Sequence, residues 1–237
     1  NELYINQQNN TFLEKAKVYG LNDPGYTTHV SFFDYDLDGD LDCYILNNSF
    51  IPVNTLNYSN KRELRAQDWP VEDFAKGGGD KLMRNDNGHF TDVSSAANIY
   101  GSLIGFGLGI TVADVNADHY PDLYISNDFF ERDYLYINQQ NGTFKEELES
   151  RISHTSQASM GADIADINND GLNDIVTLDM LPSDEKVIKT SAGEDAFEIY
   201  EFKLRYGYHY QFARNSLQLN RGLDNDGNLM FSDIAPF

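Results

Sequence analysis

The same nine-residue acidic loop occurs three times in this chain, and each copy lies between two short apolar segments. The copies cover residues 34–42, 114–122 and 166–174. Val30–Phe33 precedes the first copy and Cys43–Leu46 follows it, and the other two copies have equivalent flanks. Short runs of β-branched and aromatic residues around a polar turn are typical of β-strands. We therefore predict three strand–loop–strand units, whose downstream strands are apolar enough to be buried on both faces.

A second repeated element is a hairpin that opens each unit. Its first strand covers residues 1–6, 80–85, 133–138 and 215–220. A turn rich in Asn and Gly follows, and the returning strand begins at Phe12, Phe90, Phe144 or Phe231. Such polar turns between apolar runs predict β-hairpins.

The repeat starts near residues 1, 80, 133 and 215 fit a basic unit of about 52 residues, with insertions at about 48–79 and 180–214. Four strands per unit at this period predict an all-β fold made of β-propeller blades, each a four-stranded antiparallel sheet. We expect residues 1–237 to form part of a single propeller domain, with three complete blades and the opening hairpin of a fourth.

The two insertions are where we expect specificity, because loops on a rigid scaffold often carry function. The second insertion contains Ala196–Phe202, which predicts a helix, and an aromatic cluster at Tyr206–Phe212. That cluster has two interpretations: it packs against the propeller, or it forms a glycan- or protein-binding surface.

Each acidic loop offers oxygen side chains at positions 1, 3, 5 and 9 and a backbone carbonyl at position 7. Calcium takes six to eight oxygen ligands at flexible geometry, which suits this set. A single acidic turn could simply be solvated, but three copies in register favour bound Ca2+. The predicted ligands are Asp34, Asp36, Asp38, Asp40 and Asp42 in the first loop, Asp114, Asn116, Asp118, Tyr120 and Asp122 in the second, and Asp166, Asn168, Asp170, Leu172 and Asp174 in the third.

Position 6 of each loop must turn with positive φ, which glycine adopts at little cost. Gly39 and Gly171 meet this need, but the second loop has His119, so we expect its site to be the weakest. Asp224–Gly227 also looks like a calcium loop. It lies between two hairpin strands, however, and we interpret it as a longer turn.

The three acidic loops, Gly105–Gly107 and the stretch Asn127–Tyr136 carry a resemblance to a known family. The chain resembles the FG-GAP or VCBS repeats of integrin α-subunit propellers, and more closely the animal and Bacteroidetes-type proteins similar to cartilage acidic protein. The resemblance implies a seven-bladed propeller at the cell surface or secreted. Three units are too few for that ring, so we expect the remaining blades to come from the same longer polypeptide.

The net charge of −21 makes nucleic acid and anionic membrane surfaces poor partners. The single Cys43 excludes an internal disulfide, and its alignment with Leu123 and Ile175 predicts a core position. Weak calcium sites fill where calcium is plentiful. We therefore expect an extracellular or cell-surface location, with the bacterial outer membrane favoured by the resemblance.

The search for catalytic residues finds no nucleophile motif. The five histidines fall at different phases of the repeat, and Gly105–Gly109 leads into a strand, where a phosphate-binding loop would lead into a helix. We expect a non-enzymatic calcium-binding module that interacts with a protein or a surface glycan. The alternatives are a subunit of an outer-membrane assembly, such as a transporter accessory, and a polysaccharide-active propeller enzyme.

Overall fold

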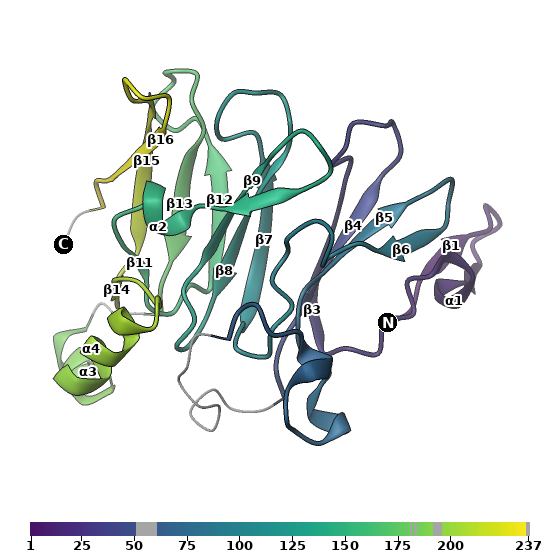
Figure 1. Cartoon of the computed structure of the whole chain (residues 1–237), viewed down its shortest axis with the longest axis horizontal. Helices are drawn as coiled ribbons and strands as arrows, with labels where there is room; N and C mark the ends of the chain where they lie inside the picture. Colours follow the sequence, from purple (N-terminus) through teal and green to yellow (C-terminus); the bar gives the residue numbers. More distant parts are fainter. Residues whose placement is uncertain (51–60, 181, 183, 192–195, 236–237) are drawn as a thin grey trace.

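Three four-stranded antiparallel sheets stand side by side in the computed structural model of the chain (Figure 1). The structure describes residues 1–50, 61–180, 182, 184–191 and 196–235. Parts of both predicted insertions, including residues 51–60 and 192–195, lie outside this range. The arrangement confirms the predicted all-β class with propeller-like blades.

The first sheet contains β3 (Thr27–Phe33), β4 (Asp42–Asn47), β5 (Lys81–Asn85) and β6 (Phe90–Asp92). The second contains β7 (Gly107–Ala113), β8 (Asp122–Asn127), β9 (Tyr134–Asn138) and β10 (Phe144–Glu146). The third contains β12 (Gly161–Ala165), β13 (Asp174–Leu178), β15 (Ser216–Leu223) and β16 (Leu229–Asp233).

The smaller elements lie outside these sheets. Two strand pairs join β1 (Tyr4–Asn6) to β2 (Phe12–Glu14) and β11 (Thr155–Ser156) to β14 (Gln211–Phe212). The helical segments are α1 (Ala16–Tyr19), η2 (Ala66–Asp68), η3 (Asp73–Ala75), α2 (Leu148–Arg151), α3 (Glu185–Ser191) and α4 (Phe197–Arg205). Helix α4 confirms the helix predicted at Ala196–Phe202.

The sheets begin half a repeat later than the sequence units. The hairpin β5–β6 opens the second sequence unit, yet β5 pairs with β4 and places Met83 opposite Cys43. A buried strand such as β4 needs hydrogen-bonding partners on both edges, and the following hairpin supplies the second one. The hairpin outside the three complete sheets is therefore β1–β2, which corrects the expectation that it would be the last one. Both insertions lie within a sheet, between its second and third strands.

Alternate residues of the central strands fill different cores, as the twofold period of a strand requires. In β4, Tyr44 and Leu46 pack between the first and second sheets, whereas Cys43 and Ile45 face a cluster with Leu21. All six residues of β4 and of β8 are buried, which confirms the prediction for these two strands. In β13 the last residue, Leu178, is exposed, so burial there is incomplete.

Close backbone packing joins the first strands of adjacent sheets. A Cβ on Gly107 would lie 2.3 Å from Cδ1 of the buried Leu46, so a larger residue here would force the Leu46 side chain to move. The Thr28 hydroxyl donates to the Gly107 carbonyl at 2.9 Å, and the Thr111 hydroxyl donates to the Ala162 carbonyl at 2.9 Å. The glycine-rich segment therefore serves packing, as the sequence indicates.

The acidic loops and the insertions occupy opposite ends of the sheets. The loop between β3 and β4 lies at the top of Figure 1, while η2, η3, α3 and α4 lie at the bottom. This follows from the antiparallel order, because the first and second strands join at one end and the second and third strands join at the other. A metal bound in the acidic loops and a partner bound by the insertions would thus lie about one strand length apart.

Candidate metal-binding loops

The three acidic loops share one backbone conformation. The fourth and sixth residues of every loop have positive φ, between 59° and 98°. The sixth position confirms the expectation from Gly39 and Gly171, and His119 adopts φ of 71°. The fourth position holds Leu37, Ala117 and Asn169. Leu and Ala give no sequence signal of a left-handed conformation, so this second turn point could not be predicted.

The first aspartate of each loop organises the backbone around its carboxylate. Asp34 accepts the N–H groups of Asp38 at 3.1 Å and Gly39 at 3.0 Å. Asp114 and Asp166 accept the equivalent pairs of N–H groups. The carboxylate at position 5 then accepts the N–H of position 7, which is Asp40, Tyr120 or Leu172. The carbonyls of these three residues remain predicted ligands.

The first loop gathers carboxylate oxygens that lack donors. Ligand atoms of Asp34, Asp36 and Asp42 lie within 4.8 Å of one another. Oδ1 of Asp36 and Oδ1 of Asp40 are buried without a hydrogen-bond partner. Burial raises the pKa of Asp36, and the neighbouring Asp38 carboxylate raises it further. Buried anionic oxygens without donors are costly, and a hard cation would satisfy them, so this donor set fits calcium.

The second and third loops replace one carboxylate with an amide. Asn116 Nδ2 donates to Asp118 Oδ2 at 3.0 Å, and Asn168 Nδ2 donates to Asp170 Oδ2 at 2.9 Å. In both loops the amide oxygen accepts the N–H of position 5. The side-chain oxygen at position 3 therefore has a donor in these two loops, whereas Asp36 Oδ1 at the same position of the first loop has none. The fit to a cation is therefore most direct in the first loop.

The ninth-position aspartates connect each loop to its sheet. Asp42, Asp122 and Asp174 are fully buried. Each accepts one N–H from loop position 2 and a second from the last residue of the predicted hairpin strand. Burial raises the pKa of Asp42 to about 6 and that of Asp122 to about 7.

An asparagine at that hairpin position links neighbouring sheets. Asn138 Nδ2 donates to the Pro121 carbonyl at 3.2 Å and to the Tyr35 carbonyl of the preceding loop at 2.8 Å. Asn220 Nδ2 makes the same two contacts, with the Asn173 and Val115 carbonyls. The sequence analysis missed these residues as functional positions. The available signal was that the six-residue hairpin strand ends in Asn in every repeat.

Two further candidates have a structural explanation. Cys43 is a buried core residue, as predicted, and burial raises its pKa to about 12, which suppresses the nucleophilic thiolate. Asp224–Gly227 forms the turn between β15 and β16, where Asp224 accepts hydrogen bonds from Asn228. Both findings agree with the sequence interpretation.

A Ser–His–Asp cluster lies near β16 and was not recognised in the sequence. Ser153 Oγ lies 3.0 Å from His154 Nδ1, and His154 Nε2 lies 2.5 Å from Asp233 Oδ2. Arg214 Nη2 lies 2.7 Å from the same His154 nitrogen. Arg214 Nη2 also donates to Asp233 Oδ2 at 2.6 Å, so the carboxylate that would orient a catalytic histidine is shared with a guanidinium. The arrangement suits a structural ion network better than catalysis.

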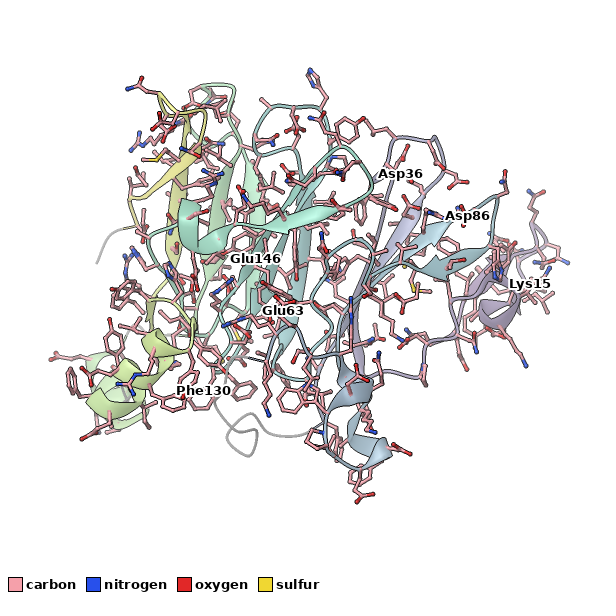
Figure 2. All side chains as sticks on the ribbon, in the orientation of Figure 1. Lys15, Asp36, Glu63, Asp86, Phe130 and Glu146 are labelled. Atoms are coloured by element: carbon pink, nitrogen blue, oxygen red, sulfur yellow. The ribbon has the colours of Figure 1, made fainter. Side chains whose placement is uncertain are left out.

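The aromatic cluster of the second insertion packs mainly against the segments that connect the strands. Tyr208 is buried, with the Arg62 guanidinium 4.9 Å above its ring centre. Gln211 donates to the Phe130 carbonyl at 3.1 Å, and Phe130, labelled in Figure 2, lies under the Lys203 ammonium at 5.1 Å. Tyr210 and Phe212 remain exposed.

The comparison with known families agrees with this geometry. Residues 114–177 match the family described as FG-GAP-like repeat. The matched segment begins at the first aspartate of the second acidic loop and ends within β13, just after the third loop. Within the described residues, the helices are too short and polar to cross a membrane. The match supports the resemblance to FG-GAP or VCBS repeats that the repeated loops indicated in the sequence.

Proposed function

We propose that this chain is a calcium-stabilised, propeller-type interaction module without enzymatic activity. One observation carries the proposal: Oδ1 of Asp36 and Oδ1 of Asp40 are buried and have no hydrogen-bond donor. The carboxylates of Asp34 and Asp42 lie beside Asp36 in the same loop. The same backbone conformation in three loops supports two further sites. In each site the residues of the chain bind and orient the cation, which would supply positive charge and hold the loop ends together.

The interaction role is supported by the division of the molecule into two ends. The acidic loops repeat with little variation, whereas the insertions differ from each other in length and sequence. Variable segments on a rigid scaffold are typical recognition elements. We propose a protein or a surface glycan as the partner. Further blades of the same polypeptide would cover exposed apolar residues of the third sheet, such as Leu178 and Met230.

The proposed location is extracellular or on the cell surface, with the bacterial outer membrane as the favoured case. Loops held by a few carboxylates bind calcium weakly, and such sites fill in calcium-rich surroundings. The strongly acidic composition also agrees with a role other than binding nucleic acid.

One alternative is a polysaccharide-active enzyme, which would need a pair of acidic side chains on either side of the scissile bond. Turnover of a polysaccharide by the protein, lost on substitution of acidic residues outside the three loops, would support this alternative. A subunit of an outer-membrane assembly is the other alternative, and copurification with a membrane partner would favour it.

The deciding experiment measures thermal unfolding and calorimetric calcium titration of the protein. At tenfold saturation each occupied site adds about 1.4 kcal/mol to the free energy of unfolding. We expect calcium to raise the unfolding temperature, magnesium to raise it less, and Asp36→Ala to lose part of the calcium increment. Asp226→Ala, in the exposed β15–β16 turn, is the matched control. An unfolding temperature that does not respond to calcium would refute the proposal.

A further inference from the structure

Two adjoining cavities lie on the outer side of the second sheet, on the side of the insertions. Their volumes are about 350 Å³ and about 440 Å³, in the range of small-molecule sites. Both are lined by Arg62, Glu63, Tyr100 and Glu146, so they form one continuous groove. Glu63 and Glu146 are close together near the centre of Figure 2.

The groove is built where three equivalent strand connections meet. Arg62 comes from the β4–β5 connection, Arg132 from the β8–β9 connection and Gly207 from the β13–β15 connection. Arg62 Nη1 donates to the Tyr206 carbonyl at 3.4 Å, and Arg132 Nε donates to the Gly207 carbonyl at 3.3 Å. Both insertions therefore contribute to this single surface.

Buried ion pairs fix the groove walls. Arg62 donates to Glu131 Oε1 at 2.9 and 2.6 Å, and both side chains are almost fully buried. Arg132 Nη2 donates to Glu146 Oε2 at 2.6 Å, and these side chains are also buried. Groups held in this way lose little entropy when a ligand arrives, which favours binding.

The charge pattern of the groove selects against charged ligands. Four basic and four acidic side chains line the two cavities. The charges of Arg62 and Glu146 are already compensated by their partners, so a ligand meets the exposed Glu63, which repels an anion, and the half-buried Arg65, which repels a cation. An apolar ligand would remove water from these charges without replacing their hydrogen bonds. The groove therefore favours an uncharged ligand with many donors and acceptors.

A polyhydroxylated ligand meets this requirement, because each hydroxyl can donate to a carboxylate and accept from a guanidinium. Tyr100 adds a half-buried aromatic ring to both cavities, against which the C–H face of a sugar can pack. A peptide that binds by adding a strand to a sheet would find only a short free edge here. The edge strand β10 has three residues, and its Phe144 N–H already donates to the Ala97 carbonyl at 2.9 Å.

We propose that this groove is a binding site for a neutral saccharide, recognised by Arg65, Glu63 and Tyr100 between the fixed walls. This inference rests on the proposed function, because it names the partner class and the surface of the interaction module. Arg65 lies across Gly101, where a Cβ would come within 2.1 Å of Arg65 Nη1, so the glycine leaves room for this side chain over the groove.

The test uses the calcium-loaded protein and five trisaccharide probes. Maltotriose, cellotriose and xylotriose are neutral, trigalacturonate is acidic, and the chitosan trisaccharide is cationic. Saturation-transfer NMR detects binding, and calorimetry measures Kd. We expect at least one neutral probe to bind at least about tenfold more tightly than both charged probes. Binding of none of the neutral probes, or equal binding of a charged one, would overturn the proposal.

Substitutions of groove residues test whether the saccharide binds in the groove. Arg65→Ala and Glu63→Gln should each weaken the neutral probe about tenfold, since each removes a charged hydrogen-bonding partner. The controls Arg84→Ala and Glu198→Gln change exposed side chains away from the groove and should leave Kd unchanged. Equal weakening by the controls would count against the site.

The rise in unfolding temperature that calcium causes, called the increment below, is measured on the same samples. If that increment is present and no neutral probe binds, the saccharide site is wrong while the calcium-stabilised module stands. If the increment is absent, the proposed function fails independently of the groove result.

Discussion

The two ends of the sheets are stabilised in different ways. At the acidic-loop end, the same hydrogen bonds recur in three loops, and the asparagine contacts between sheets recur twice. At the insertion end, one set of contacts recurs in two sheets, in which Asp80 and Asp133 each accept from a tyrosine hydroxyl and an asparagine N–H. The buried ion pair of Arg62 and Glu131, in contrast, occurs once. Repetition thus builds a scaffold at one end, and unrepeated ion pairs build a distinct surface at the other.

This difference predicts where a single substitution acts most strongly. At the repeated end each residue shares its task with equivalent residues in other loops. At the insertion end one side chain joins several connections: Glu131 Oε1 accepts two hydrogen bonds from Arg62 and one from the Arg132 N–H. The largest single loss of stability should therefore come from the insertion end.

Glu131→Gln should give that loss, about 3–5 kcal/mol in the free energy of unfolding. The substitution keeps the volume of the side chain but removes the carboxylate charge that lies 2.6 Å from the buried Arg62 guanidinium. Urea unfolding followed by Trp69 fluorescence and circular dichroism measures the effect. The matched control is Asp86→Asn, which breaks the exposed Arg84–Asp86 pair and should cost at most about 1 kcal/mol. Similar losses in both variants would contradict the contrast between buried and exposed pairs.

The sequence predicted the repeated end well and the insertion end poorly. From the periodic loops and hairpins we could predict the strands, the burial of β4 and β8, and the left-handed conformation of Gly39 and Gly171. The half-repeat offset of the sheets was missed, because the order of strands along the chain does not state which neighbours pair. The pairing of Arg62 with Glu131 could not be predicted either, since it joins unrepeated segments 69 residues apart.

The acidic-loop end should respond to pH through its buried aspartates. Asp122, with its pKa raised to about 7, and Asp42, at about 6, hold protons in the folded state that an unfolded aspartate releases near pH 4. In calcium-free buffer the free energy of unfolding should therefore fall as pH rises from 4 to 7. Calcium competes with these protons, so its stabilising increment should be larger at pH 7.5 than at pH 5.5.

The expected difference is roughly 2 kcal/mol for the second loop, because pH 5.5 is about 1.5 units below the pKa of Asp122 and each unit is worth about 1.4 kcal/mol. Urea unfolding at both pH values, with calcium and in calcium-free buffer, measures it. An equal calcium increment at pH 5.5 and 7.5 would show that Asp122 does not take part.

Asn138→Ala should cost about 1–2 kcal/mol, because it leaves the Tyr35 and Pro121 carbonyls without their amide donor. Asn85→Ala is the matched comparison. Asn85 Nδ2 donates to the Leu41 carbonyl at 3.0 Å within its own sheet, without an equivalent of the Tyr35 contact among the described hydrogen bonds. Chemical unfolding in calcium-free buffer should show a smaller loss for Asn85→Ala. Equal losses would mean that the contact between sheets adds little.

His119→Gly tests the smallest effect, the departure of the second loop from the other two. His119 has φ of 71°, and the equivalent residues are Gly39 and Gly171. A non-glycine residue in this region costs on the order of 1 kcal/mol, part of which the greater freedom of glycine in the unfolded chain cancels. The substitution keeps the N–H that donates to Asp114 Oδ2 at 2.8 Å. We therefore expect a gain of about 0.5 kcal/mol in stability and tighter calcium binding at this loop, measured by thermal unfolding and calorimetry. Gly171→His is the reciprocal change and should weaken the third loop. If His119→Gly instead destabilises the protein, the side chain contributes more than its strain costs, and the second loop is adapted to histidine.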